Sequence, residues 1–307
     1  MKPEVSVIIV SYNVKQLLFT CLNTLYKFNS NLNLEVIVID NESKDGSGEM
    51  VKESFPKVHL IENNFNAGFS GANNQGMRIA KGEFIFLLNP DTEFLDDSLV
   101  KLVTFTKSQP EISLVAPKLL NTDHSLQISV WKDHNYTDLI LETFYLNKVY
   151  DRINYLPEQF QISFEAKTIS GAAMFFNRKL MDSIGMLDEN YFWMEDIDFS
   201  VRAQKIGKVF YYRDAVIVHH SGQSQKKNYD KSIANQLISK LKFYKKNESK
   251  LAYWLSVFSC FLLILSRWFV FTILSPLKNI YRLKAKAYFY TYNRFFDYIF
   301  SNKKGIM

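Results

Sequence analysis

The chain has 307 residues, of which 47% are hydrophobic and 15% aromatic, and it carries a net charge of +6. This length suits one large domain, or one domain with an appendage, and allows a substantial core. The sequence has no zinc-type spacing, no aromatic RNA-binding motif and no arginine-rich arm, so no nucleic-acid partner is expected. Its two cysteines, Cys21 and Cys260, lie far apart in apolar surroundings and are expected to be reduced.

Apolar runs and helical spacings alternate along the first part of the chain and predict an α/β fold. Continuous apolar runs are typical of strands buried on both faces, and apolar residues three and four apart are typical of helices. We expect strands at Val5–Val10, Leu34–Ile39, Val58–Ile61, Glu83–Leu88 and Ile112–Ala116, and helices at 14–28, near 46–54 and at 95–109. This order predicts a Rossmann-like, mostly parallel sheet with right-handed crossovers and flanking helices.

Polar residues stand directly after the first two strands. Tyr12 and Asn13 follow the first strand, and Asp40 and Asn41 follow the second. Ligands of parallel sheets bind beyond the carboxyl ends of the strands, so these four residues are candidates for a binding site.

The next two polar segments also suggest ligand binding. Asn63–Gly82 is rich in asparagine and glycine and predicts a loop and helix start with close backbone approach to a ligand. It lacks the glycine pattern of dinucleotide-binding proteins, which disfavours NAD. Asn89-Pro90-Asp91 follows the fourth strand, and a carboxylate held there suits a hard divalent cation that also binds phosphate oxygens. Pro-Asp is also typical of a type I turn.

The middle of the chain has no clear period. Pro117–Gln127 is expected to be a loop or an edge segment, and 128–165 a mobile insertion over the site with some helix at 137–149. Thr168–Asn177 then predicts a strand that starts with small residues, and 178–185 predicts a short helix.

Three carboxylates, on Glu195, Asp196 and Asp198, follow an aromatic segment at 191–193. Adjacent acids beside an apolar wall suit a group whose proton affinity is tuned for base catalysis. The same pattern is typical of a helix N-terminus, where acids favour the helix dipole and Arg202 pairs with Asp198 one turn later. Both interpretations can hold at once.

The last predicted strand, Val209–His219, ends in two consecutive histidines, His219 and His220. A histidine at a strand end among small residues can be a metal ligand. Successive strand residues point to opposite faces, so at most one of the two is expected to face the site.

Together and in this order, these segments resemble glycosyltransferase family 2, the inverting enzymes of the GT-A fold. The closer resemblance is to its rhamnosyltransferase-like members, which build O-antigen, capsule and cell-wall glycans. The resemblance covers about residues 4–224. It rests on Val5–Asn13, Asp40–Ser43, Asn66–Gly68, Asn89–Asp91, Ser170–Ala172, Trp193–Asp198 with Arg202 and Gly207, and His219 with Gly222 and Ser224. Each motif alone is weak, and all of them in register are specific.

The resemblance implies roles for the matching residues. Asp196 is the implied catalytic base, and Asp91 and His219 are implied ligands of Mg²⁺ or Mn²⁺. Asn89 stands where many members have the first acid of the metal motif, so donor phosphates would have to complete the metal's shell. The implied substrate-binding residues are Tyr12, Asn13, Asp40, Asn66, Gly68, Asn89, Gly171, Trp193 and Glu195.

Within that set the resemblance divides the donor from the acceptor. Tyr12 and Asp40 would line the nucleobase pocket, and Asn66 and Gly68 would shape the loop beside the donor diphosphate. Trp193, in the aromatic segment before the acids, would form part of the acceptor wall.

The composition changes after Ser224 and becomes basic and aromatic, which points to a membrane surface. We therefore expect a catalytic domain at 1–224 and a helical, membrane-associating region at 225–307. Ala252–Leu274 is long enough to cross a hydrocarbon core of ~30 Å and carries one charge, Arg267, which could extend to an interface. A spanning or re-entrant hairpin, a helix in the bilayer surface and a buried soluble helix pair all remain open.

The expected function is metal-dependent transfer of a sugar from a nucleotide-diphosphate donor to a polyprenyl-diphosphate-linked glycan acceptor in bacterial surface polysaccharide synthesis. The favoured donor is dTDP-rhamnose. The expected place is the cytoplasmic face of the bacterial inner membrane, with peripheral or integral attachment through 252–300. The alternatives are the same fold with a UDP- or GDP-hexose donor, and a non-catalytic scaffold that binds nucleotide or glycan.

Overall fold

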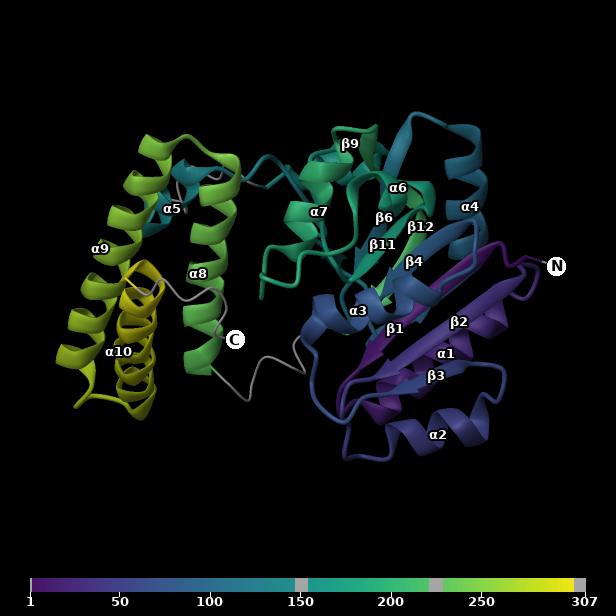
Figure 1. The fold of residues 1–307 in the computed structure, drawn as a ribbon, viewed down its shortest axis with the longest axis horizontal. Helices are drawn as coiled ribbons and strands as arrows, with labels where there is room; N and C mark the ends of the chain where they lie inside the picture. Colours follow the sequence, from purple (N-terminus) through teal and green to yellow (C-terminus); the bar gives the residue numbers. More distant parts are fainter. Residues whose placement is uncertain (1, 147–153, 221–228, 301–307) are drawn as a thin grey trace. The chain divides into compact units, whose positions relative to one another are not determined.

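Figure 1 shows the chain as a computed structural model that describes residues 2–146, 154–220 and 229–300. These residues form two compact units. The first comprises 2–132, 154–189 and 195–220, and the second comprises 133–146, 190–194 and 229–300. The expected domain boundary at 224 lies outside the described residues, as do Gly222 and Ser224 of the last motif.

The first unit is built on one mixed sheet with the strand order β3-β2-β1-β4-β11-β6-β12-β5. The strands are β1 (Val5–Ser11), β2 (Leu34–Asp40), β3 (His59–Glu62), β4 (Phe84–Leu88), β5 (Thr92–Phe94), β6 (Ile112–Leu120), β11 (Ala173–Asn177) and β12 (Lys208–His219). Two short strands, β7 (Leu126–Gln127) and β9 (Phe164–Ala166), pair with β6 and β12. A separate ribbon joins β8 (Val130–Trp131) to β10 (Thr168–Ile169).

Strand direction decides which residues meet at the edges of this sheet. β1 pairs in parallel with β2 and β4, and β12 pairs in parallel with β6. β11 is antiparallel to both β4 and β6, so β6 and β12 run in the same direction as the first group. The carboxyl ends of β1, β2, β4 and β12 and the beginning of β11 therefore share one edge.

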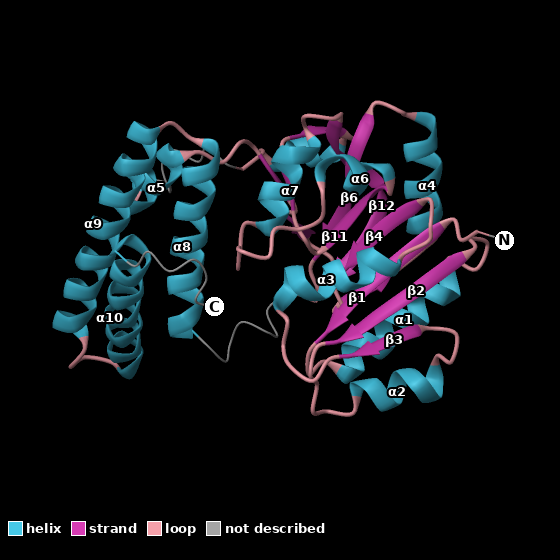
Figure 2. Cartoon of the chain, viewed as in Figure 1, coloured by secondary structure: helices cyan, strands magenta, loops and turns pink. Residues whose placement is uncertain are grey.

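Helices cover both faces of the sheet (Figure 2). α1 (Lys15–Phe28), α2 (Ser47–Ser54) and α4 (Ser98–Ser108) contribute to the same core as Val7 and Ile9 of β1. α3 (Gly68–Ile79), α6 (Lys179–Ile184) and α7 (Glu195–Ala203) contribute to a second core with Ile8. Alternate residues of a strand point to opposite faces, which is why a continuous apolar run can serve two cores.

The structure confirms the α/β fold and the strands and helices expected before residue 117, with small differences at their ends. Beyond residue 116 the structure differs from the expected loop or edge segment, because β6 continues to Leu120 and the short strand β7 follows. Thr168–Asn177 divides into β10 and β11, because a turn at 171–172 interrupts the strand. The short strand β5 was not anticipated. The helix expected at 137–149 is α5 (Tyr136–Thr143), and 147–149 lie outside the described residues.

The second unit is a bundle of α5 with α8 (Tyr229–Asn247), α9 (Lys250–Leu274) and α10 (Asn279–Phe300). Of the helices in the described part of the chain, α9 is the one long and apolar enough to cross a membrane. The expectation that Arg267 could extend to an interface is wrong, because the residue is buried and only 7% exposed. Its guanidinium donates to the backbone carbonyls of Glu142 at 2.8 Å and Thr143 at 3.4 Å, at the end of α5. A cation interacts favourably with the dipole there, so Arg267 stabilises the bundle interior.

One glycine of the first unit has no room for a side chain. A Cβ atom at Gly207 would lie 2.4 Å from the backbone carbonyl oxygen of Glu111, which also accepts a hydrogen bond from the Lys208 N–H at 2.8 Å. We expect Gly207→Ala to lower the free energy of unfolding by about 1–3 kcal/mol, because the backbone itself must shift. Urea denaturation of the full chain, followed by circular dichroism, measures this loss.

The matched control is Gly71→Ala in α3, where the nearest atom would be the Ala67 Cβ at 3.4 Å. Alanine is a better helix former than glycine by about 0.5–1 kcal/mol, so this variant should be as stable as the wild type or more stable. Equal unfolding midpoints for the two variants would contradict the close contact at Gly207.

Candidate functional site

The loop after β1 is tied to the loop after β2. Asn13 has a positive φ of 54°, and its backbone N–H donates to Ser43 Oγ at 2.9 Å. Its side-chain oxygen accepts from the Lys44 N–H at 2.7 Å. Asp40 is nearly buried and accepts from the Ser43 N–H at 3.0 Å. Tyr12, just after the end of β1, is 47% exposed. The ends of the two strands therefore carry polar groups and one aromatic ring that is accessible to solvent.

Asn41 organises the next loop. It is 2% exposed, and its amide nitrogen donates to Asn66 Oδ1 at 2.8 Å. Its amide oxygen accepts from Asn63 Nδ2 at 3.1 Å and from the Ala67 N–H at 2.9 Å. Asn66 Oδ1 also accepts from the N–H of Gly68, whose φ of 72° begins α3. The sequence placed Asn41 at a strand end but did not indicate that it holds this loop.

A second group of contacts lies at the ends of β4 and β12. His219 Nε2 is 3.2 Å from Asp91 Oδ1 and 3.3 Å from Asn89 Nδ2. The side chains of His219 and Asp91 are only 12% and 14% exposed. The Asn89 N–H donates to the Ala172 carbonyl at 2.9 Å, which joins this group to the beginning of β11.

Gln127 orients the His219 ring, and the sequence did not predict this. His219 Nδ1 is 2.7 Å from Gln127 Oε1, and Gln127 Nε2 donates to Asn121 Oδ1 at 2.8 Å and to the His219 carbonyl at 3.3 Å. An amide oxygen only accepts, so Nδ1 carries a proton and Nε2 faces Asp91. No local pattern indicates this contact, because it depends on the pairing of β6 with both β7 and β12.

His220 differs from His219 in its contacts. Its Nε2 is 3.0 Å from Glu93 Oε2, and its Nδ1 is 3.0 Å from Thr122 Oγ1. Both ring nitrogens therefore already have protein partners away from Asp91. The His219 and His220 side chains thus have different partners, as expected for consecutive residues that point to opposite faces of a strand.

Asp196 lies in the first turn of α7 and is half-buried. The Gly171 N–H donates to its Oδ2 at 2.8 Å, and the Ile197 N–H donates to its Oδ1 at 2.8 Å. Burial raises the pKa of the Asp196 carboxyl above its usual range, and the two N–H donors only partly oppose this shift. Gly171 makes this contact possible, because a Cβ atom there would lie 3.2 Å from the Phe69 ring and 3.5 Å from Asp196 Cβ.

The other two acids of α7 have different surroundings. Asp198 is 1% exposed, and its Oδ2 accepts from Arg202 Nε at 2.8 Å, which matches the expected helical ion pair. Arg202 also donates to the carbonyls of Ile184 at 2.6 Å and Met186 at 2.9 Å, so the pair anchors α7. Glu195 is half-buried in the first turn of the helix. The acids thus occupy a helix N-terminus, as one of the two interpretations predicted.

Trp193 and Met194 precede α7 with φ values of 92° and 100°. Positive φ is strained for residues with side chains, and two in succession are rare. Both residues belong to the second unit, whereas Glu195 and Asp196 belong to the first. Of the candidate site residues, Trp193 is therefore the one that does not belong to the unit with the sheet.

The buried thiol near the site is unsuited to nucleophilic chemistry. Cys21 Sγ is 3.3 Å from Thr92 Oγ1 and 3.8 Å from the Asn89 carbonyl oxygen. Burial raises the pKa of the Cys21 thiol to about 12, so it remains protonated at neutral pH. Its role is to pack beneath the Asn89–Asp91 turn.

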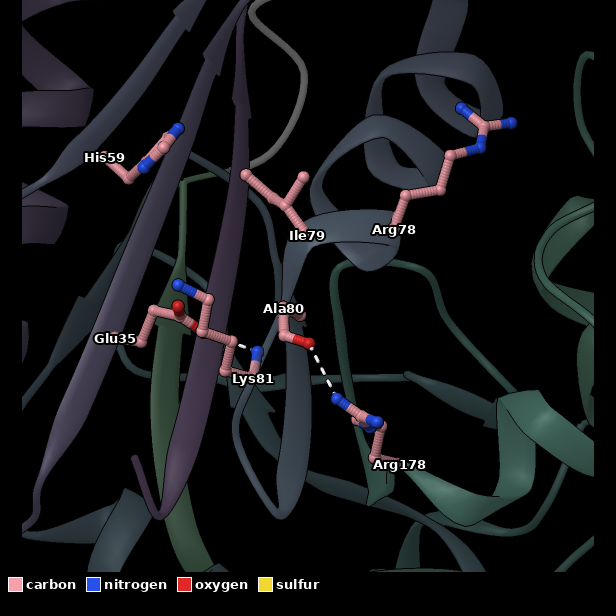
Figure 3. Close-up of a pocket in the computed structure, with 7 residues that line it drawn as sticks. All are labelled: Glu35, His59, Arg78, Ile79, Ala80, Lys81 and Arg178. Carbon is pink, nitrogen blue, oxygen red and sulfur yellow. Dashed lines mark hydrogen bonds between the residues drawn. The ribbon is translucent and has the colours of Figure 1, made fainter. Parts of the chain in front are cut away.

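A cavity of about 530 Å³ lies at the opposite edge of the sheet (Figure 3). Its walls include Glu35 near the beginning of β2, His59 at the beginning of β3, and Arg178 just after β11. Arg178 donates to the Ala80 carbonyl at 3.0 Å. This cavity shares no lining residue with the groups described above, so it is separate from the candidate site.

Comparison with known sequences gives one family. The profile of Glycosyl transferase family 2 matches residues 6–185. The low-salt glycan biosynthesis hexosyltransferase Agl10 of Haloferax volcanii is 26% identical over 213 residues, covering 67% of this chain and 63% of that protein. The N-acetylglucosaminyl-diphospho-decaprenol L-rhamnosyltransferase of Mycobacterium tuberculosis is 25% identical over 209 residues, covering 62% of this chain and 68% of that protein. The chain thus spans less than two thirds of the Haloferax relative.

Comparison with solved structures gives the same fold. The mannosyltransferase PcManGT from Pyrobaculum calidifontis, in complex with GDP-Man and Mn²⁺, superposes with a TM-score of 0.58 at 15% identity, covering 99% of this chain and 89% of that one. The common architecture is the GT-A fold. Because the profile match covers more than half of the sequence, and because the fold agrees with it, the chain belongs to glycosyltransferase family 2.

Proposed function

We propose that the chain is an inverting, metal-dependent glycosyltransferase that moves a sugar from a nucleoside-diphosphate donor to a lipid-linked glycan. The observation that carries this proposal is the grouping of Asp91, His219 and Asp196 around the beginning of β11, where Asn89 and Gly171 link them. The side chains of Asp91 and His219 suit a cation that binds a diphosphate. The Asp196 carboxylate suits removal of a proton from an acceptor hydroxyl.

The donor set at Asp91 and His219 fits a hard divalent cation. His219 Nε2 faces a carboxylate oxygen at 3.2 Å, a contact that needs either a proton or a cation between the two atoms. No group of three or more His, Cys, Asp and Glu side chains gathers into a metal site anywhere in the described ranges. Phosphate oxygens of the donor would therefore complete the shell. When bound, Mg²⁺ or Mn²⁺ would neutralise charge on the leaving diphosphate.

Asp196 is the proposed catalytic base. Its carboxylate accepts the proton of the acceptor hydroxyl while that oxygen bonds to the anomeric carbon, and the bond from that carbon to the diphosphate oxygen breaks. A single displacement of this kind inverts the anomeric centre. The N–H groups of Gly171 and Ile197 hold the carboxylate in place during the transfer.

The other site residues are proposed to bind the donor and acceptor. Tyr12 and Asp40 would contact the nucleobase, and the loop at 63–68 would contact the diphosphate. Asn13 supports this binding indirectly, since it holds the loop after β2. On the acceptor side, Trp193 and Glu195 are the proposed contacts.

The proposed sugar is rhamnose from dTDP-rhamnose. The support is the likeness to the mycobacterial rhamnosyltransferase, at 25% identity. The Haloferax hexosyltransferase is equally similar, so a UDP- or GDP-hexose is the alternative donor. A non-catalytic scaffold is disfavoured, because Asp91, His219 and Asp196 are all present in the arrangement described above.

The proposed acceptor is a glycan on a polyprenyl diphosphate at the cytoplasmic face of a bacterial inner membrane. The mycobacterial relative is named for such an acceptor, a diphospho-decaprenol. The apolar helix α9 supports association with the membrane that would carry it. Nucleotide sugars are made in the cytoplasm, which places donor and acceptor on the same side.

A thermal-shift screen tests the donor. We expect dTDP-rhamnose to raise the melting temperature in the presence of Mn²⁺ and to lose this effect in EDTA. Binding of ligand to the folded state stabilises it by about 2.7 kcal/mol at one hundred times Kd, which is readily measured as a shift. Stabilisation by UDP- or GDP-sugars alone would show that the donor is a hexose nucleotide and not dTDP-rhamnose. No stabilisation by any nucleotide sugar would contradict the proposed function.

Replacement of the base should affect chemistry and leave donor binding intact. We expect Asp196→Asn to lower kcat for sugar transfer by about 10²–10⁴-fold, the usual contribution of a general base. Its thermal shift with the donor and Mn²⁺ should match the wild type. The control is Asp182→Asn, an exposed acid of α6 that should leave both measurements unchanged.

The pH profile gives a further check on Asp196. Since burial raises the pKa of this carboxyl, it stays protonated at pH values where an ordinary aspartic acid is ionised. The acid limb of kcat against pH should therefore lie above the usual range for aspartate, with activity rising as pH rises through it. An acid limb that persists in the residual activity of Asp196→Asn would assign it to another group.

Gln127 should control the tautomer of His219. In Gln127→Leu the Nδ1 proton loses its acceptor, so we expect the neutral ring to protonate Nε2, which can then donate to Asp91. Long-range ¹⁵N–¹H NMR at pH 8 distinguishes the two tautomers, with the spectrum of His220 as an internal control. We also expect weaker retention of Mn²⁺ in the presence of nucleoside diphosphate, measured by electron paramagnetic resonance. An unchanged His219 tautomer in the variant would show that Gln127 does not orient the ring.

A further inference from the structure

The helix α9 has one face that packs inside the bundle and one that is exposed. The buried face carries Ser256, Ser259 and Arg267 together with apolar residues, including Leu263 and Ile264. Of the residues exposed between Leu251 and Leu274, Ser266 and Thr272 are polar and the others are apolar. We call the exposed face the outer stripe, and its most exposed apolar members are Leu251, Trp254, Leu255, Phe258, Phe269, Val270 and Ile273.

The outer stripe follows helical spacing. Leu251, Trp254, Leu255 and Phe258 are three and four residues apart, and Phe269, Val270 and Ile273 repeat the pattern. No charged residue interrupts it. A surface helix in water exposes mainly polar residues, so the large apolar side chains exposed on α9 depart from that pattern. An apolar face of this length on a folded unit marks contact with another apolar phase.

Basic residues stand at both ends of the stripe. Lys245, Lys246 and Lys250 are exposed at its beginning, and Lys278 and Arg282 are exposed just beyond its end. Lysine and arginine beside an apolar surface favour anionic lipid headgroups. A second copy of the chain fits less well, because parallel or antiparallel pairing of two stripes would bring basic ends together.

Contacts along α9 argue against a membrane span. α10 lies beside it over most of its length, with ring centroids of Phe261 and Phe295 6.2 Å apart, and those of Trp268 and Phe289 5.4 Å apart. The outward side of α10 carries exposed charges, including Arg282, Lys286 and Asp297. A spanning α9 would carry these charges through the hydrocarbon core, where charged side chains are strongly disfavoured.

We propose that α9 lies in the plane of an anionic leaflet, with its outer stripe in the acyl layer, and that it does not cross the membrane. This deepens the membrane association in the proposed function and selects one of the three arrangements that the sequence left open. Arg267 and the serines of the buried face remain inside the protein. The charged side of α10 remains in the headgroup region or in water.

Vesicle co-sedimentation of the full chain tests the lipid contact. We expect binding to phosphatidylcholine vesicles that contain phosphatidylglycerol, and at least tenfold weaker binding of Phe258→Glu and Phe269→Glu. The matched control is Ile206→Glu, which changes an exposed apolar residue of the first unit and should bind like the wild type. Because all three residues are exposed, melting temperatures should be unchanged. Wild-type protein that ignores vesicles, or stripe variants that bind normally, would overturn the proposal.

Cysteine labelling distinguishes an in-plane helix from a span. Asn247→Cys and Asn279→Cys place single exposed thiols before and after α9, and the native Cys21 and Cys260 are buried. In inside-out membrane vesicles we expect a membrane-impermeant maleimide to label both sites, and in right-side-out vesicles neither. Labelling of one site from each side would show a span and overturn the proposal. Donor binding in the thermal-shift screen needs no membrane, so failure here leaves the proposed enzymatic function to be judged separately.

Discussion

The antiparallel strand β11, inserted between β4 and β6, is the constraint on which the candidate site depends. Since it runs against its neighbours β4 and β6, its beginning rather than its end lies beside the carboxyl end of β4. The Ala172 carbonyl then accepts from Asn89, and the Gly171 N–H donates to Asp196. If β11 ran parallel to its neighbours, this position would hold the end of the strand, and Asp196 would lose the Gly171 N–H as a donor.

Two opposing effects meet at the Asp196 carboxyl. Burial disfavours its charged form and raises its pKa, whereas the N–H groups of Gly171 and Ile197 favour that form. The result is an acid with a higher proton affinity than usual that is still held in one orientation. Such a balance suits a base, which must accept a proton without rotating away from its substrate. Asp198, which pairs with Arg202, has the contrasting structural role.

In the second unit, as at Asp196, hydrogen bonds with the backbone accompany the burial of a charged side chain. Arg267 is buried because the carbonyls at the end of α5 accept from its guanidinium, and the neighbouring Tyr145 ring lies 4.2 Å from it. Arg267 is thus buried among apolar residues, while other apolar side chains of α9, such as Trp254 and Phe258, are exposed. The length and apolar composition of α9 alone therefore do not show that it spans a membrane.

The sequence by itself determined the fold class and most of the elements, because buried strands and helices have distinct apolar periods. It also indicated Asp40, Asp91, Asp196 and His219, since polar residues at strand and helix ends stand out against apolar runs. Only the tertiary structure revealed the parts played by Asn41 and Gln127. Their hydrogen bonds join loops far apart in the chain, and no local pattern encodes such contacts. The same holds for Arg267, whose burial depends on a helix more than a hundred residues earlier.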